Sequence, residues 1–175
     1  MLGAFSMHIW AALSLLLPFC ASLAAAPMDA EMGQGQTIDR FAYDGPSFLK
    51  GCDTENQIRE LGKIRSAISK KEINIYDGTP LFVKRLVFVN GLEVNFRSFG
   101  SPPRAQLTSV FVTSPKWPIE HGLSVGARAD TVIEALGRPT KKADDQIEYL
   151  GETERVVFSV DHGVITEILF DYYYE

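Results

Sequence analysis

Hydrophobic residues recur with helical spacing in the segment 122–139, whose sequence is GLSVGARADTVIEALGRP. Val132, Ile133 and Leu136 fall on one face of a helix, and charged residues occupy the other faces. Gly137 follows the last apolar position and suits the left-handed cap with which many helices end. The pattern therefore predicts a short amphipathic helix that stops at Gly137.

Three runs after this helix alternate hydrophobic and polar residues, as half-buried strands do. They are Gln146–Leu150, Arg155–Asp161 and Val164–Phe170. The tripeptide Asp161-His162-Gly163 between the last two runs is typical of a tight turn. Because the connections are short, we expect the three strands to form an antiparallel meander behind the helix.

The first half of the chain carries a similar series. Asp53 or Thr54 can cap a helix that runs to about Leu61, and we expect further helical turns over Ile64–Lys70. The dipeptide Asn90-Gly91 is a hairpin signal. Strands are predicted for the alternating runs Glu72–Tyr76, Leu86–Asn90, Leu92–Phe96 and Leu107–Thr113.

The two series share a short motif. Residues 58–63 and 133–138 both read I-x-x-L-G-[KR], and similar strand runs follow each copy. The match is either a degenerate tandem repeat or a chance agreement of a few positions. As a repeat, it predicts an α+β fold in which two pseudo-repeated modules, each a helix followed by an antiparallel meander, form curved antiparallel sheet.

The chain divides into five segments on this interpretation. They are a signal peptide (1–24), a flexible lead-in (25–47), a first module (48–113), a linker (114–121) and a second module (122–175). The leader is an apolar block interrupted by Pro18, too short to span a membrane comfortably, and Ser22-Leu23-Ala24 fits a cleavage site before Ala25. We therefore expect export to the periplasm by a cleaved signal and no membrane span.

The two cysteines support this assignment. Phe19 stands directly before Cys20, where a lipoprotein signal needs a small residue, so lipidation of Cys20 is the minor alternative. If Cys20 leaves with the leader, Cys52 is alone and the mature chain has no internal disulfide. An exported chain without disulfides is more typical of a bacterial periplasm than of an extracellular scaffold.

Charge and motifs limit the function. The chain has 17 Lys and Arg against 22 Asp and Glu, a net charge of −5, which argues against a nucleic-acid or anionic-membrane partner and favours a basic one. It contains no catalytic, phosphate-binding or metal-ligand motif with specific spacing. We therefore expect a binding protein rather than an enzyme, with no cofactor and no metal. A Cys52–histidine pair and a site built from loop aspartates are the weaker alternatives.

Aromatic residues raise two open questions. Trp117, in a linker that contains two prolines, is either a plug between the modules or an exposed anchor for a partner. The run 172–174, three tyrosines, is either an interface or an untidy last core strand.

The helix and meander of the second half resemble a known family. The pattern G-[IL]-x-x-G-x-x-x-x-x-V-x-x-x-L-G-x-P in residues 122–139 looks like the outer-membrane assembly lipoprotein family BamE (SmpA/OmlA), over roughly the last third of the chain. The paired modules are similar in outline to the β-lactamase-inhibitor-like fold, in which paired sheets make a broad face for binding. The first resemblance implies an envelope scaffold that binds an outer-membrane complex.

On class, length and serine positions the chain also resembles the periplasmic immunity proteins of type VI secretion peptidoglycan-amidase effectors. This resemblance implies an inhibitor that occludes the active site of a cell-wall hydrolase, which we expect to be basic and which could be a cysteine amidase. A small hydroxyl would enter the cleft of the hydrolase and aromatic residues would exclude water. The residues proposed for this contact are Ser109, Ser114, Trp117, His121 and Ser124. The alternative for two of them is structural, with Ser109 a strand residue and Ser124 a helix cap.

Overall fold

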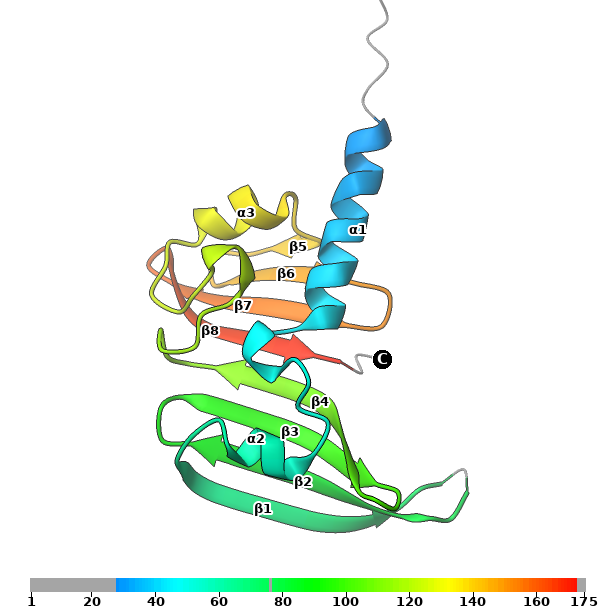
Figure 1. Ribbon diagram of the computed structural model, residues 1–175. Coiled ribbons are helices and arrows are strands. Elements are labelled where there is room, and N and C mark those ends of the chain that lie inside the picture. Colours follow the sequence, from blue (N-terminus) through cyan, green and yellow to red (C-terminus); the bar gives the residue numbers. More distant parts are fainter. Residues whose placement is uncertain (1–27, 76, 173–175) are drawn as a thin grey trace, which may run out of the picture.

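The computed structural model describes residues 28–75 and 77–172 (Figure 1). The predicted signal peptide and two of the terminal tyrosines, Tyr173 and Tyr174, lie outside these residues. Eight antiparallel strands form one sheet in the order β1-β2-β3-β4-β8-β7-β6-β5. The strands are β1 (Ile64–Ile73), β2 (Pro80–Phe88), β3 (Leu92–Phe99), β4 (Arg104–Val112), β5 (Lys141–Lys142), β6 (Gln146–Leu150), β7 (Arg155–Asp161) and β8 (Val164–Asp171). With the helices described below, this is an α+β fold, as predicted.

The sheet is assembled from two similar halves. The helix α2 (Glu55–Arg59) precedes the meander β1–β4, and the helix α3 (Asp130–Leu136) precedes the meander β5–β8. The halves meet through the antiparallel pair β4 and β8, in which Val110 lies opposite Phe170. Each half is thus a helix followed by a meander, and the second meander has one more strand than predicted because Lys141–Lys142 pairs with β6.

All helices of the described residues lie against the same face of the sheet (Figure 1). Besides α2 and α3, they are α1 (Met28–Asp44) and the short 3-10 helices η1 (Ser47–Leu49) and η2 (Glu120–Gly122). No helix of the described residues covers the opposite face, which we call the uncovered face. None of the described helices is long and apolar enough to cross a membrane.

The segment predicted to be a flexible lead-in forms the 17-residue helix α1 instead. Ile38, Phe41 and Ala42 are spaced i, i+3, i+4 and are all buried, and the helix packs against β6 and α3. This apolar pattern covers only five residues and follows a run of glycine and glutamine, so the sequence gives little indication of a helix here. Burial of this one stripe against the sheet stabilises a helix whose own sequence only weakly favours it.

Helix α2 begins where one of the two predicted caps places it. The hydroxyl of Thr54 accepts a hydrogen bond from the backbone N–H of Gln57, so Thr54 rather than Asp53 is the N-cap. Glu55 attaches the helix to β2 through an ion pair with Lys84, and it also pairs with Arg59 at 2.7 Å. Burial raises the pKa of Glu55, but hydrogen bonds from Lys84 and Arg59 together lower the pKa by more than burial raises it. The pKa of Glu55 therefore lies below its usual value.

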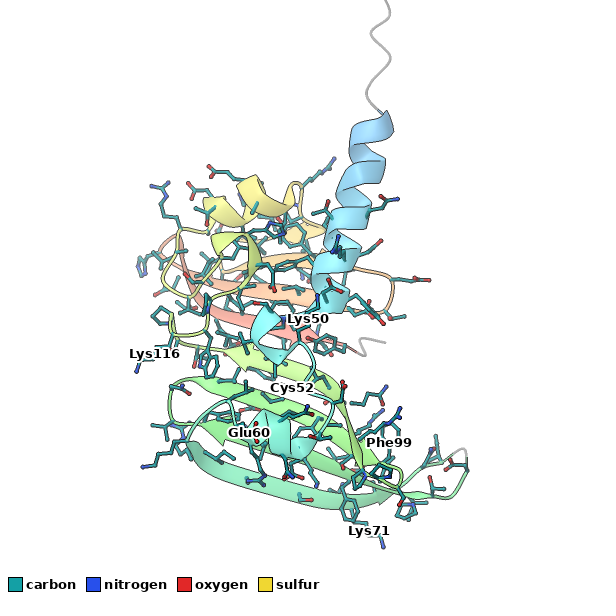
Figure 2. All side chains as sticks on the ribbon, in the orientation of Figure 1. Lys50, Cys52, Glu60, Lys71, Phe99 and Lys116 are labelled. Atoms are coloured by element: carbon teal, nitrogen blue, oxygen red, sulfur yellow. The ribbon has the colours of Figure 1, made fainter. Side chains whose placement is uncertain are left out.

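The prediction of helical turns over Ile64–Lys70 is wrong, because these residues form most of β1. From Ser66 onward, residues of β1 pair in regular register with β2, as Ala67 does with Leu86, and this pairing overrides the local helical preference. The extra strand predicted before the first meander therefore exists but begins eight residues earlier than expected, at Ile64 instead of Glu72. β1 is the edge strand, and Lys71 extends from it away from the sheet (Figure 2).

Helix α3 ends as its sequence predicts but begins differently. Gly137 has φ +80°, and its N–H donates to the carbonyl of Ile133 at 2.8 Å, so the C-cap requires the positive φ that glycine allows. Its ψ of −153° is not that of the left-handed helical region expected. The N-cap position is Ala129, which makes no side-chain hydrogen bond, so Ser124, the cap that the sequence suggested, is not used.

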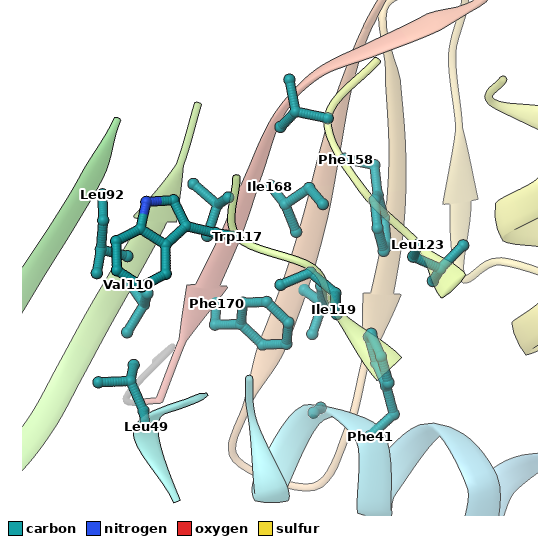
Figure 3. Packing of buried hydrophobic residues seen from close by; sticks show 14 of the residues in the cluster. Phe41, Leu49, Leu92, Val110, Trp117, Ile119, Leu123, Phe158, Ile168 and Phe170 are labelled. Atoms are coloured by element: carbon teal, nitrogen blue, oxygen red, sulfur yellow. The ribbon is translucent and has the colours of Figure 1, made fainter. Parts of the chain in front are cut away.

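The hydrophobic core lies between the sheet and the helices (Figure 3). At the junction of the two halves, Phe41 of α1 and Leu49 of η1 lie over strand residues that include Phe170. The rings of Phe41 and Phe170 are 5.6 Å apart. Trp117 and Ile119 of the linker fill the space between the two halves. The linker is therefore part of the core rather than an exposed connection.

Candidate functional site

The five residues proposed from the sequence do not form one site. Ser114, Trp117, His121 and Ser124 belong to the segment between β4 and α3, which runs over the helix-covered face. Ser109 lies on β4 opposite Asn95, and this pair is on the uncovered face, since their neighbours Val94 and Val110 point into the core. The sheet therefore separates Ser109 from the other four.

Trp117 is a plug and not an exposed anchor. Its side chain is only 8% exposed, and its ring lies 4.8 Å from that of Phe48. The indole Nε1 donates a hydrogen bond to the carbonyl of Asn90 at 3.0 Å, which joins the linker to the β2–β3 hairpin. Such a residue cannot contact a partner without unfolding of this region, so the anchor alternative is wrong.

The two linker serines have local structural roles. The hydroxyl of Ser114 accepts a hydrogen bond from the N–H of Lys116 at 3.3 Å. The carbonyl of Ser124 accepts one from Ala127 at 3.2 Å within a turn, and Ser124 does not cap α3. Nothing in these contacts directs either side chain toward a partner.

His121 lines a cleft of about 740 Å³ between α1, η1 and η2. Its backbone has φ +60°, uncommon for a non-glycine residue, and its ring lies 5.9 Å from that of Phe41. The neighbouring Glu120 has one carboxylate oxygen, Oε2, that is buried without a hydrogen-bond partner. The cleft is large enough for a small molecule.

Tyr172 closes one side of this region. Its hydroxyl points at Gly45, where an added Cβ would lie 1.9 Å from the oxygen. Burial, and then the charges of Glu120 and Glu154, raise the pKa of Tyr172 well above its usual value. Tyr172 thus packs against the core, in agreement with the core alternative for the first of the three tyrosines.

A row of polar residues crosses the uncovered face. Cross-strand register places Arg85 opposite Asn95, Asn95 opposite Ser109, Ser109 opposite Asp171, and Asp171 opposite Arg155. We call these five residues, Arg85, Asn95, Ser109, Asp171 and Arg155, the polar row. The row runs over five adjacent strands, and Ser109 stands at its centre, on the strand where the two halves of the sheet meet.

Hydrogen bonds hold the polar row in place. Asn95 Nδ2 donates to Ser109 Oγ at 3.1 Å and to Glu93 Oε1 at 3.1 Å, and Arg85 pairs with Glu93 at 2.6 Å. At the other end, Arg155 pairs with Asp171 at 2.9 Å. The hydroxyl of Ser109 accepts from Asn95, and its own proton has no acceptor among the described residues. Ser109 can therefore donate a hydrogen bond to a partner.

An apolar row lies beside the polar one on the same face. It consists of Val87, Phe111, Leu169 and Val157, and it is interrupted by Glu93, which lies opposite both Val87 and Phe111. Cross-strand register sets Phe111 opposite Leu169 and Leu169 opposite Val157. Val157 is buried and the other three are partly exposed. Near Val87 and Phe111 the surface is hollowed, with a volume of about 350 Å³. The two rows together make an amphipathic surface of the kind found at protein interfaces.

The described residues show no catalytic or metal-binding constellation. Burial, and then the charges of Asp53 and Glu60, raise the pKa of Cys52, so its thiol stays protonated at neutral pH and is a poor nucleophile. Figure 2 shows Cys52 between η1 and α2. His162 is an exposed turn residue with φ +50°, 2.8 Å from Asp161. Within these residues no three His, Cys, Asp or Glu side chains are grouped to hold a metal ion.

Sequence reasoning identified Ser109 but missed the rest of the polar row. Asn95, Ser109 and Arg155 lie on strands that the sequence predicts, whereas Arg85 and Asp171 each lie one residue outside the predicted strands Leu86–Asn90 and Val164–Phe170. Which outward residues become neighbours depends on the register between strands that are distant in the chain, such as β4 and β8. The order of the strands in the sheet was therefore needed to find the row.

Comparisons with known proteins identify no family. No protein-family model and no curated protein matches the chain. Among solved structures, it is similar to the "Crystal structure of the uncharacterized protein yfeY from Escherichia coli", with 13% sequence identity and a TM-score of 0.41. The match covers 73% of this chain and 95% of that one. A similarity this low supports no argument about function.

Proposed function

We propose that this protein is a periplasmic inhibitor, an immunity protein that binds a peptidoglycan-degrading amidase through the uncovered face of the sheet. The observation that carries the proposal is the polar row beside the apolar row at the centre of that face. Of the predicted contact residues, we retain only Ser109 in the proposed interface. The linker residues are assigned a structural role within the protein.

The uncovered face is suited to binding because its polar groups are already fixed. Glu93 pairs with Arg85 and accepts a hydrogen bond from Asn95, and Asp171 pairs with Arg155, so little side-chain entropy is lost when a partner binds. The free hydroxyl proton of Ser109 can reach an acceptor in a narrow cleft. Phe111 and its apolar neighbours would exclude water around that contact.

The charge of the chain supports a basic partner. The net charge is −5, and opposite charge on the hydrolase would steer the two proteins together. On this proposal the inhibitor blocks access of peptidoglycan to the active site of the hydrolase and performs no chemistry itself.

The test begins with a pull-down from periplasmic extract using the chain from Ala25, followed by reconstitution with the recovered hydrolase. We expect near-stoichiometric binding and loss of amidase activity on purified peptidoglycan. Ser109→Arg should weaken binding by about tenfold or more, because a bulky cation would stand at the centre of the face. The matched control is Ser101→Arg in the exposed β3–β4 loop, which should bind like the unaltered protein.

Two results would overturn the proposal. Recovery of outer-membrane assembly proteins instead of a hydrolase would favour the envelope-scaffold alternative. Equal inhibition by the Ser109→Arg variant and the unaltered protein, with equal melting temperatures, would exclude the uncovered face as the binding surface.

A further inference from the structure

We infer that the free edge of β1 binds an extended acidic segment of a partner protein, which adds to the sheet as a ninth strand. This inference does not depend on the proposed inhibitor function, because it concerns the edge of the sheet and not its uncovered face. It rests on the length and exposure of β1, on its charge, and on the contrast with the opposite edge.

The two edges of the sheet differ sharply. β1 is a ten-residue strand, and β5, at the other edge, has only two residues. A very short edge strand is one way in which proteins avoid unwanted pairing, and a long one is a template for another strand. Among the described residues β1 pairs only with β2, so no described strand pairs with its outer edge.

The side chains of β1 are also open to solvent. All of its residues except Ile64 and Glu72 are exposed, and Ile68 and Ile73 are 56% and 58% exposed. Because strand residues alternate between faces, Ile68 and Ile73 lie on opposite faces of the sheet. Side chains of an added strand would pack against one isoleucine on each face, which supplies cross-strand contacts in addition to backbone hydrogen bonds.

The charge of β1 indicates the chemistry of its partner. The strand carries Arg65, Lys70 and Lys71 but only one acid, Glu72, so its net charge is +2 in a chain whose total is −5. Glu72 pairs with Lys70 at 2.9 Å, and Lys71 extends from the edge into solvent (Figure 2). A partner strand with carboxylates would be attracted along the whole edge.

The same charges disfavour pairing with a second copy of this chain. Two β1 strands side by side would bring two segments of net charge +2 together in one ladder, where like charges are destabilising. Lysine on an edge strand therefore has two effects, because it rejects copies of the same strand and selects an acidic one. The occupant that fits is an extended segment in which acidic residues alternate with residues of high strand propensity.

The experiment uses the full mature chain and three blocked ten-residue peptides. The first alternates threonine with glutamate, the second alternates threonine with lysine, and the third has the sequence of the first with a methyl group on every backbone nitrogen. The third peptide carries the same charge as the first but has no backbone N–H group with which to donate hydrogen bonds to a sheet. Binding is measured by fluorescence anisotropy, and hydrogen exchange follows the amides of β1 and of β6, the longer strand next to the opposite edge.

We expect the threonine–glutamate peptide to bind and to slow exchange of β1 amides while β6 amides are unchanged. The other two peptides should bind at least about tenfold more weakly. The double variant Lys70→Glu, Lys71→Glu should lose binding by a similar factor. Its matched control is Lys141→Glu, Lys142→Glu, two exposed lysines on the opposite edge, which should bind like the unaltered protein.

Each contrary result overturns the inference. If the threonine–glutamate peptide does not bind, the inference that β1 pairs with an acidic strand is excluded. Equal binding of the N-methylated peptide would show attraction by charge without strand addition. Equal loss in the two double variants, with unchanged melting temperatures, would show that the edge of β1 has no special role.

Discussion

Replacement of Trp117 by alanine tests the assignment of the linker to the core. Trp117 is 8% exposed, packs against the Phe48 ring at 4.8 Å and donates to the Asn90 carbonyl at 3.0 Å. Truncation of a buried tryptophan removes its transfer free energy and leaves a cavity, so Trp117→Ala should lower the free energy of unfolding by about 3–5 kcal/mol. For a chain of this length that corresponds to a melting temperature lower by roughly 10 °C.

Two further variants divide this loss into its parts. Trp117→Phe keeps an aromatic ring in the core but loses the hydrogen bond to Asn90, and we expect a loss of about 1–2 kcal/mol. Lys116→Ala changes an exposed neighbour and should stay within about 0.5 kcal/mol of the unaltered protein. The three variants are compared by urea denaturation followed by far-UV circular dichroism, because the mutation itself removes the main fluorescent reporter.

The reasoning would be refuted by a small effect. If Trp117→Ala lost less than about 1 kcal/mol with an unchanged denaturant slope, the linker would contribute little to the core. Trp117 would then again be a candidate for contact with a partner.

Other predictions follow from single residues. Gly91→Ala should destabilise the protein clearly more than Gly78→Ala, as a comparison of melting temperatures would show. Both glycines have positive φ, but a Cβ at Gly91 would lie 2.7 Å from the Cβ of Ser114, whereas a Cβ at Gly78 would have no neighbour within 4 Å. The ion pairs of Glu55 should contribute to the free energy of unfolding at any pH above the pKa of Glu55 in the unfolded chain. That contribution should be lost as the pH falls through the lowered pKa of Glu55 in the folded protein, so the difference in stability between Glu55→Gln and the unaltered protein should shrink in acid. Burial raises the pKa of Tyr149 to about 12, so its contribution should be complete below pH 10 and be lost as pH rises toward 12. Tyr149→Phe should cost about 1 kcal/mol near neutral pH through the lost bond to Gly137, and it should remove that alkaline loss of stability in a pH series of melts.

Only one of the five predicted contact residues lies on the uncovered face, the surface that we propose for binding. Four of the five lie on the helix side, and Trp117 in particular is committed to the core. Ser109 alone lies in a surface that combines fixed polar groups with apolar neighbours. The inhibitor proposal therefore rests on strand residues at the middle of a sheet rather than on the loops at the module junction.

Local patterns were sufficient for the elements whose stability is local. Alternation in β3, β7 and β8, the hairpin at Asn90-Gly91 and the end of α3 at Gly137 follow from side-chain periodicity and from the backbone freedom of glycine. The series of a helix followed by strands in each half was also visible, although the start of β1 and the whole of β5 were not.

The elements that the sequence did not determine are those that depend on distant partners. Helix α1 forms because Ile38, Phe41 and Ala42 are buried against other elements, and β1 is a strand because it pairs with β2. The polar row exists because β4 pairs with β8, residues about 60 positions away, in one particular register. Periodicity along the chain decides which side a residue faces, but only the tertiary structure decides which residues then stand beside it.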